Sequence, residues 1–313
     1  MEATATRSVR AIRRRKSFLR NYQLYLLVAV PLLYFIVFKY IPMYGAQIAF
    51  RDYTARGGFW GSEWVGLKHF VSFFRSFQFR RIILNTFGLS LYSLFAGFPI
   101  PILLAIALNN ARTARFKKTV QMVTYAPHFI STVVMCGIII QFLSPNVGIV
   151  NQVIKALGFE PIGFMGQSQW FKTVFVLTDI WQQAGWASII YLSALASVST
   201  ELHEAAIVDG ATIFQRNLHI DFPAILPVAT ILLILAVGRL MTVSFEKVLL
   251  LQNALNLEAS EVIQTFVYKR GIAWQPPNYS FASAVGFFNS IVNFALLVSV
   301  NAFSKRTSGN SLW

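Results

Sequence analysis

The sequence has few charged residues and almost no cysteine. Only 12% of its 313 residues are Asp, Glu, Lys or Arg, whereas soluble domains carry about 25%. Its single cysteine, Cys136, rules out an intrachain disulfide and cannot form a cysteine metal site alone. The four histidines lack a metal-ligand spacing such as H-E-x-x-H. The composition therefore argues against an ordinary soluble domain and gives no sign of a metal site.

Long apolar segments are the main feature of what remains. Hydrophobic residues make up 56% of the chain and the mean hydropathy is +0.56. A membrane-spanning helix needs about 20 mostly apolar residues, because the hydrocarbon core is about 30 Å thick. Six segments have that length: residues 22–43, 82–108, 119–143, 170–198, 224–251 and 280–303. The sequence therefore predicts an all-α integral membrane protein with a six-helix transmembrane domain over residues 22–303.

The basic residues predict the orientation in the membrane. Lysine and arginine mark cytoplasmic loops, and seven of them precede the first apolar segment. With the N-terminus inside, fourteen basic residues of the tails and loops fall on the cytoplasmic side and nine fall outside. Six of these nine lie in the first outer loop and argue mildly against this orientation. We therefore expect cytoplasmic tails at residues 1–21 and 304–313. We read the net charge of +15 as a topology signal and a contact with anionic lipid, not as nucleic-acid binding.

Residues 199–223 form a polar segment between two apolar ones. Thr200 can cap a short helix, and Glu204 lies near the positive end of that helix. Gly210 can end this helix, and Thr212 with Gln215 has the spacing of a capping box that begins a second helix. The pattern predicts a helix–turn–helix outside the membrane, with a surface that another protein can approach closely.

The order Glu204-Ala205-Ala206, then Gly210, then Ile220-Asp221-Phe222-Pro223 resembles the EAA loop of bacterial ABC-importer permeases, although Phe222 stands where that family usually has leucine. Further segments resemble the subfamily that imports oligo- and polysaccharides, including alginate oligosaccharides. They are Phe38-Lys39-Tyr40-Ile41-Pro42-Met43-Tyr44-Gly45, Trp64-Val65-Gly66-Leu67-Lys68, Tyr125-Ala126-Pro127-His128-Phe129-Ile130-Ser131 and Phe245-Glu246-Lys247-Val248.

This resemblance implies a non-enzymatic permease subunit in the bacterial cytoplasmic (inner) membrane. Its implied partners are a second homologous permease, two ATPase subunits, an extracytoplasmic solute-binding protein, a saccharide and membrane lipid. The chain lacks the motif G-x-x-x-x-G-K-[ST], so ATP and Mg would bind to the ATPases and the chain would carry no cofactor itself. The resemblance makes the 199–223 loop a coupling helix between spans four and five. The residues expected to contact or position the ATPase are Glu204, Ala205, Ala206, Asp209, Gly210, Ile220 and Pro223.

Polar residues within the apolar segments predict a substrate pathway. Charged groups at membrane depth cost roughly 2.5–3.5 kcal/mol each, so they usually face a cavity or a partner. The candidate pathway residues are Asp179, Gln182, Gln183, Trp186, Arg239, Glu246, Lys247, Asn289 and Asn293. Pro127 is expected to kink the third span, and Pro99 and Pro101 to bend the second.

Three interpretations of the pathway residues remain open. They form interhelical contacts, with an ion pair between Asp179 and Arg239 and a bond between Gln182 and Asn289. They bind sugar hydroxyls, with Arg239 or Lys247 attracting a carboxylate of an acidic, uronate-type saccharide. Or they relay protons.

Two other functional classes compete with an ATP-driven importer. An ion-coupled secondary transporter would use Asp179, Arg239 and Glu246, and often shows inverted repeats, which we do not find in the sequence. An intramembrane enzyme would need paired catalytic groups, and none are evident in the sequence.

Overall fold

The computed structural model describes residues 20–307, 309 and 311–313. Most of the predicted basic tail, residues 1–19, lies outside the described residues. The chain divides into two compact units, Met1–Gly66 and Leu67–Trp313.

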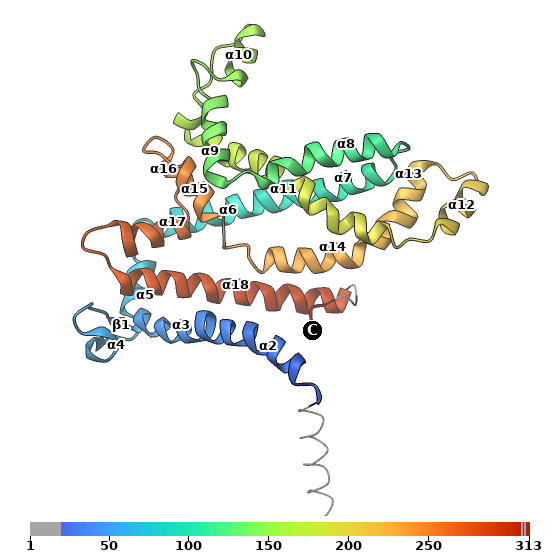
Figure 1. Ribbon diagram of the computed structural model, residues 1–313. Coiled ribbons are helices and arrows are strands. Elements are labelled where there is room, and N and C mark those ends of the chain that lie inside the picture. Colours follow the sequence, from blue (N-terminus) through green and yellow to red (C-terminus); the bar gives the residue numbers. More distant parts are fainter. Residues whose placement is uncertain (1–19, 308, 310) are drawn as a thin grey trace, which may run out of the picture. The chain divides into compact units, whose positions relative to one another are not determined.

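The first unit contains a long apolar helix followed by a short hairpin (Figure 1). Its helical part runs through α2 (Tyr22–Phe35), the π-helical segment η1 (Ile36–Tyr40), α3 (Ile41–Met43) and the 3₁₀-helix η2 (Tyr44–Phe50). The hairpin strands β1 (Arg51–Asp52) and β2 (Glu63–Trp64) pair antiparallel on either side of α4 (Gly58–Gly61). No side chain of α2 is buried, as expected for a helix that faces lipid or a partner helix.

The second unit is a bundle of long helices (Figure 1). Its long elements are α6 (Phe79–Gly97) with α7 (Pro99–Asn109), α11 (Ser168–Leu195), α14 (Phe222–Val237) and α18 (Tyr279–Thr307). Helix α11 packs against α6, α7 and α14, and α14 packs against α18. The central position of α11 explains why it can carry polar residues, since its neighbours supply their partners.

Shorter elements connect and cover this bundle. They are α5 (Lys68–Phe74), α8 (Ala114–Tyr125), η3 (Ala126–Phe129), α9 (Thr132–Phe142), α10 (Ile149–Ala156), η4 (Phe164–Gly166), α12 (Thr200–Val208), α13 (Ile213–Arg216), η5 (Asn217–Asp221), α15 (Phe245–Leu251), α16 (Leu257–Ser260), α17 (Ile263–Tyr268) and η6 (Lys269–Ala273). Helices α12 and α13 lie at the end of the unit where α7 and α18 finish, and α5, α16 and α17 lie at the opposite end (Figure 1).

Four helical stretches within the described residues are long and apolar enough to cross a membrane. They are Tyr22–Phe50, Phe79–Asn109, Ile213–Val237 and Tyr279–Thr307. A fifth is reached if Ala114–Phe129 and Thr132–Phe142, which meet at an angle of 104°, form one broken span. Helix α11 has 28 residues but is not in this set. The prediction of six crossings therefore stays a prediction.

Of the two predicted spans in which prolines were expected to cause bends, the third is broken. The third, expected over 119–143, breaks sharply after η3, which contains Pro127, and restarts at α9, where Ser131 caps the helix by accepting a hydrogen bond from Val134 N–H at 3.4 Å. The kink expected near Pro127 is thus confirmed, although the sharp bend falls at Ile130 and Ser131, just beyond the short η3 that contains the proline. Between α6 and α7 only Phe98 separates the two helices, and its φ of −63° and ψ of −40° are helical, so Phe79–Asn109 remains one helical stretch.

The prediction of one continuous helix over 224–251 is wrong. Helix α14 ends at Val237 and α15 begins at Phe245. The backbone N–H of Met241 in this break donates to Asn293 Oδ1 at 2.9 Å, and Asn293 Nδ2 donates to Thr242 Oγ1 at 2.9 Å. The side chain of Asn293 therefore satisfies one backbone N–H in the break, that of Met241, which sequence periodicity alone does not predict.

The interior of the second unit consists of apolar clusters with one very close helix contact. One cluster joins α9, α11 and α15, and a second joins α5, α6, α17 and α18. At Gly185 a Cβ atom would lie only 2.0 Å from the carbonyl oxygen of Thr124. Helices α8 and α11 can therefore approach this closely only because residue 185 has no side chain.

Candidate functional site

The polar segment forms the predicted helix–turn–helix. Helix α12 is capped by Ser199, whose hydroxyl accepts a hydrogen bond from Glu201 N–H at 3.2 Å, so the prediction that Thr200 is the cap was wrong by one residue. Gly210 has a φ of +76°, the left-handed conformation that glycine adopts without strain. The chain can therefore turn sharply after α12.

The second short helix begins with the predicted capping box. The hydroxyl of Thr212 accepts from Gln215 N–H at 3.3 Å, and Gln215 Oε1 accepts from Thr212 N–H at 2.8 Å. These reciprocal bonds satisfy N–H groups that a helix start leaves open. The local sequence is therefore sufficient to begin α13.

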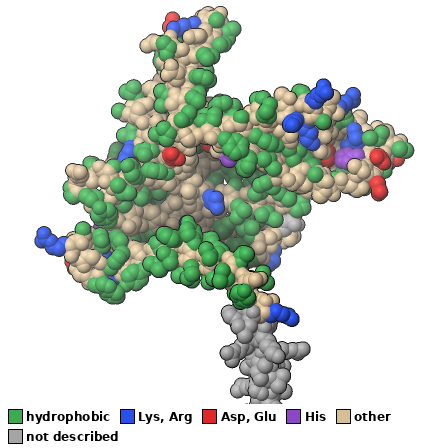
Figure 2. Space-filling model, in the orientation of Figure 1, with side chains coloured by type: hydrophobic (Ala, Val, Ile, Leu, Met, Phe, Trp, Pro, Cys, Tyr) green, Lys and Arg blue, Asp and Glu red, His purple; other side chains and the backbone are tan. Residues whose placement is uncertain are grey.

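The helix–turn–helix exposes apolar as well as polar side chains. Val208 is 87% exposed and Phe214 is 74% exposed, and Leu202 and Ile207 are also exposed. Acidic and histidine side chains gather over α12 and α13, and Lys and Arg side chains lie over the neighbouring α8 (Figure 2). A projecting element with apolar residues rimmed by charges is typical of a protein-docking surface.

The seven predicted coupling residues fall into two groups. Five lie on α12 and the turn after it; Ala206 is half-buried and the other four are exposed: Glu204, Ala205, Asp209 and Gly210. Ile220 and Pro223 lie instead on η5 and the first turn of α14. The structure thus separates five residues at the tip from two at the base of the segment.

A buried carboxylate, which the sequence patterns did not single out, connects this base to the bundle. Asp221 is fully buried, and its Oδ1 lies 3.4 Å from His203 Nε2 on α12 and 3.4 Å from Asn109 Nδ2 on α7. A second polar contact joins Asn110 Nδ2 to Asn217 Oδ1 at 2.9 Å. The helix–turn–helix is therefore fixed to the end of α7 and to the start of α14 by polar contacts.

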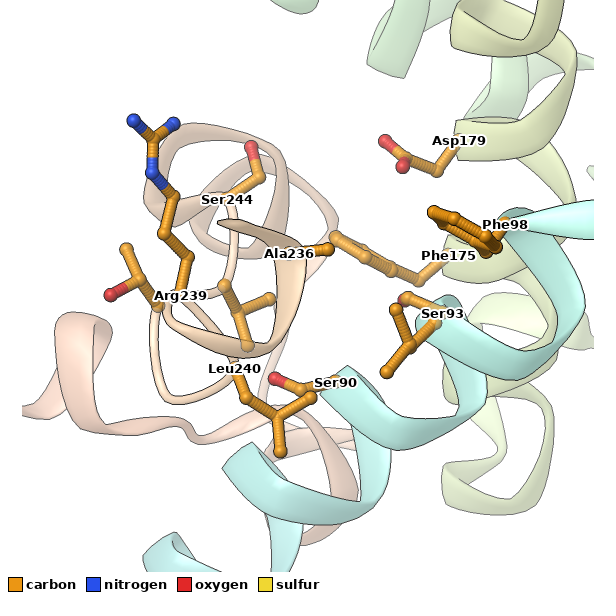
Figure 3. Close-up of a pocket in the computed structure, with 12 residues that line it drawn as sticks. Ser90, Ser93, Phe98, Phe175, Asp179, Ala236, Arg239, Leu240 and Ser244 are labelled. Atoms are coloured by element: carbon orange, nitrogen blue, oxygen red, sulfur yellow. The ribbon is translucent and has the colours of Figure 1, made fainter. Parts of the chain in front are cut away.

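A second group of predicted residues lines cavities between the helices. Asp179 borders a cavity of about 310 Å³ with Arg239 and a neighbouring cavity of about 300 Å³. Its carboxylate points into the first cavity, whereas the guanidinium of Arg239 lies on the other side and points away (Figure 3). The structure pairs Asp179 with Lys247 at 3.2 Å, and not with Arg239.

Lys247 has the most buried charge in this group. Its side chain is 2% exposed, while that of its partner Asp179 is 37% exposed. The ammonium group also lies 5.1 Å from the centre of the Phe175 ring. A buried ammonium needs such compensation, and its partner Asp179 lines the cavity whereas Lys247 does not.

The rest of the polar stripe on α11 contacts the break in the third span. Gln183 Oε1 lies 2.9 Å from His128 Nδ1, and the His128 ring stacks on Trp186 with the centroids 4.6 Å apart. Gln182 Nε2 donates to the carbonyl of Ile130 at 3.2 Å and so does not bond to Asn289. These three side chains of α11 thus hold the non-helical segment in place.

The remaining predicted pathway residues are dispersed. Glu246 is exposed on α15, and Asn293 supports the break after α14. Asn289 lines a different cavity, between α17 and α18, where its buried Oδ1 has no partner within the described chain. The structure therefore places Asp179 and Arg239 on one cavity, with Lys247 paired to Asp179 behind the lining, but it does not bring all nine residues together.

Comparisons with known proteins show the family of the chain. The model of the family "binding-protein-dependent transport system inner membrane component" matches residues 78–309. Protein LplB of Bacillus subtilis (strain 168) is 40% identical over 294 residues, which cover 94% of this chain and 92% of the relative. The polygalacturonan/rhamnogalacturonan transport system permease protein YteP of the same organism is 42% identical over 283 residues, covering 90% and 88%.

A solved structure is also similar over nearly the whole chain. It is a crystal structure of a bacterial ABC transporter involved in the import of the acidic polysaccharide alginate. One of its chains matches with a TM-score of 0.87 and 37% identity, covering 95% of this chain and 99% of that one. The family match and the identity over most of the length agree, and the chain belongs to the family of inner membrane components of binding-protein-dependent transport systems.

Proposed function

We propose that this chain is the permease subunit of an ATP-driven importer that moves oligo- or polysaccharides across the bacterial cytoplasmic membrane. The observation that carries the proposal is the exposed, capped helix–turn–helix at one end of a helix bundle that belongs to a transporter family. One relative is named for the transport of polygalacturonan and rhamnogalacturonan, and a similar structure for the import of alginate. These names support a saccharide as the substrate and favour an acidic one.

In this proposal the chain crosses the membrane six times with both termini in the cytoplasm. Helix α11 is the fourth crossing, although it is not among the stretches that are long and apolar enough to cross a membrane. Its polar side chains have partners inside the bundle, such as Lys247 for Asp179 and Ile130 for Gln182, which lowers the cost of placing them at membrane depth. Helix α12 and the end of α18 then share the cytoplasmic side.

The partners in this proposal are a second homologous permease, two ATPase subunits that bind ATP and Mg, a solute-binding protein and membrane lipid. A solved neighbour contains a bacterial alginate ABC transporter in complex with an alginate pentasaccharide-bound periplasmic protein, which supports a binding protein on the outer side. Helix α12 docks on one ATPase through Glu204, Ala205, Ala206, Asp209 and Gly210.

The coupling step depends on the base of the helix–turn–helix. When the ATPases close, α12 moves with them, and the contacts of Asp221 to His203 and Asn109 carry the movement to α7 and α14. Ile220 and Pro223 shape this connection and do not touch the ATPase. Buried polar contacts suit this role because breaking them is costly, so the connected elements move together.

The substrate path in this proposal runs along the cavities beside Asp179. Asp179 and Gln183 supply hydrogen-bonding groups there. Gln182 and Asn293 act as structural contacts, because their amides are already bonded to the backbone. The alternative of an ion-coupled transporter requires Asp179 to exchange protons freely, and its bond to Lys247 argues against that role.

The test is uptake into proteoliposomes that contain this chain with its partner permease, ATPases and binding protein. Gly210→Val forces a β-branched residue into a left-handed conformation, which costs about 1–2 kcal/mol. Gly210→Asn is the matched control, because asparagine tolerates this conformation and a Cβ at this position would meet nothing within 4 Å. We expect Gly210→Val to lose uptake and ATPase retention, and Gly210→Asn to keep both.

A second pair of variants tests charge at the docking surface. Glu204→Lys reverses a charge at the tip of the predicted contact, and Glu201→Lys makes the same change nearer the start of α12. We expect Glu204→Lys to release the ATPase and Glu201→Lys to retain it. Uptake that proceeds without any ATPase would contradict the proposal and favour ion coupling.

A further inference from the structure

A basic cleft lies at the end of the second unit opposite α12 and α13. The start of α6, helices α16 and α17 and η6 enclose a cavity of about 370 Å³, lined by three basic residues and one acidic one: Arg81, Lys269, Arg270 and Glu261. A second cavity of about 250 Å³ shares Arg270 and Trp274 with the first. Both volumes suit one or two sugar residues, and the larger lies within the range of roughly 300–1,000 Å³ common for small-molecule sites.

The charges of this cleft do not cancel. Arg81 forms an ion pair with Glu261, and Lys269 donates a hydrogen bond to Gln252. Arg270 forms no ion pair with any carboxylate of the described residues. The cleft therefore keeps a surplus of two positive charges, and one of them is a guanidinium that no acid neutralises.

Two aromatic rings hold that guanidinium in position. Its central carbon lies 3.8 Å from the centroid of the Trp274 ring and 5.4 Å from that of Phe266. Stacking occupies the flat face of a guanidinium and leaves its N–H edges available for a bidentate bond to a carboxylate. Trp274 itself is 55% exposed, so it can also contact the apolar face of a sugar ring.

The backbone around Arg270 is fixed before any ligand arrives. A Cβ at Gly271 would lie 2.8 Å from the Cβ of Ala282, so η6 packs against α18 at a distance that only glycine allows. The carbonyl of Arg270 accepts from Asn278 N–H at 2.9 Å, and the carbonyl of Lys269 accepts from Trp274 N–H at 2.9 Å. A preorganised site loses less entropy on binding.

We propose that this cleft is an entry subsite that binds one uronate residue of an anionic oligosaccharide, with Arg270 on its carboxylate and Trp274 against its ring. The inference rests on the proposed function, which puts this end of the unit on the outer side. A saccharide fits better than an acidic protein surface, because the space is concave and small, whereas a protein partner needs about 800 Å² of surface on each side.

The test measures binding and uptake with the whole transporter in nanodiscs and proteoliposomes. The probes are a radiolabelled tri-uronate and the same trisaccharide with its carboxylates reduced to alcohols. Arg270→Gln should weaken binding of the tri-uronate about 10- to 100-fold, as expected for loss of hydrogen bonds to a charged group, and leave the reduced trisaccharide unaffected. Arg80→Gln is the matched control, since Arg80 is exposed next to the cleft but does not line it.

Arg270→Lys keeps the inference testable if the glutamine variant does not assemble. Lysine keeps the charge but lacks the planar fork, so we expect an intermediate loss of tri-uronate binding with normal assembly on size exclusion. Equal tri-uronate binding by the native and Arg270 variants, with uptake intact, would refute the subsite and leave the proposed function standing. Uptake of neither probe by the native complex would contradict the proposed function.

Measuring the docking of the binding protein distinguishes a saccharide subsite from a contact with that protein. If Arg270→Gln weakens docking of the ligand-free binding protein as strongly as it weakens tri-uronate binding, the cleft is a protein contact and the subsite is refuted. Unchanged docking together with weakened tri-uronate binding is the result that we expect.

Discussion

Replacing Asp179 should lower the free energy of unfolding much more than replacing its partner Lys247. The Lys247 side chain is 2% exposed and that of Asp179 is 37% exposed, with 3.2 Å between Nζ and Oδ1. Asp179→Asn leaves an ammonium in the interior without its counter-charge. Breaking a buried pair in this way costs about 3–5 kcal/mol, and the lower end applies here because the Phe175 ring still contacts the cation.

The opposite change should cost much less. Lys247→Met replaces a buried cation with an apolar side chain of similar length. It leaves the carboxylate of Asp179 facing a cavity, where partial exposure limits the loss to about 1 kcal/mol. We therefore expect a difference of about 2 kcal/mol between the two single variants, and we expect the double variant to be more stable than Asp179→Asn alone.

Equilibrium unfolding by sodium dodecyl sulfate in mixed micelles measures these differences, with all variants in the same micelle composition. Glu246→Gln, an exposed neighbour of Lys247, is the control and should change the free energy of unfolding by less than about 0.5 kcal/mol. The reasoning is refuted if Lys247→Met is as damaging as Asp179→Asn, or if the two changes simply add in the double variant.

Three further predictions concern buried contacts. Gly185→Ala would place a Cβ 2.0 Å from the Thr124 oxygen and should prevent folding of the unit, whereas Gly137→Ala, with nothing within 4 Å, should leave monodisperse protein on size exclusion. Asp221→Leu removes the acceptor that joins α7 to α12 and should cost roughly 1–3 kcal/mol of stability in the same unfolding assay; an unchanged value would show that the contact is not structural. Asn151 donates to three backbone carbonyls and accepts from one N–H, so Asn151→Leu should increase proteolysis of the loop between α9 and α11. A loop that stays as resistant to protease as in the native protein would contradict this prediction.

Local features of the sequence predicted local structure well. The capping box of Thr212 and Gln215, the left-handed Gly210 and the break at Pro127 all appear in the structure. Each depends on groups within a few residues of one another, so the chemistry of the residues is enough to define the geometry. The cap at Ser199 in place of Thr200 shows the limit, because neighbouring hydroxyl residues compete for the same position.

Contacts between distant residues were not predictable in the same way. Asp179 on α11 pairs with Lys247 on α15, a helix that begins at Phe245 only after the break that follows Val237. A continuous helix, which the apolar run suggested, would have presented other residues. The periodicity of a sequence gives the faces of one helix but not which neighbour meets each face.

The sequence by itself determined that the chain is an apolar, helical protein with one capped polar segment, since composition and capping are properties of short stretches. Only the tertiary structure decided which charges are neutralised. It buries Lys247 against Asp179, connects Asp221 to two helices and leaves the guanidinium of Arg270 stacked on Trp274 without an acidic partner among the described residues. The physical reason is that the energy of a charge depends on burial and on the groups around it, and these groups come from helices far apart in the sequence.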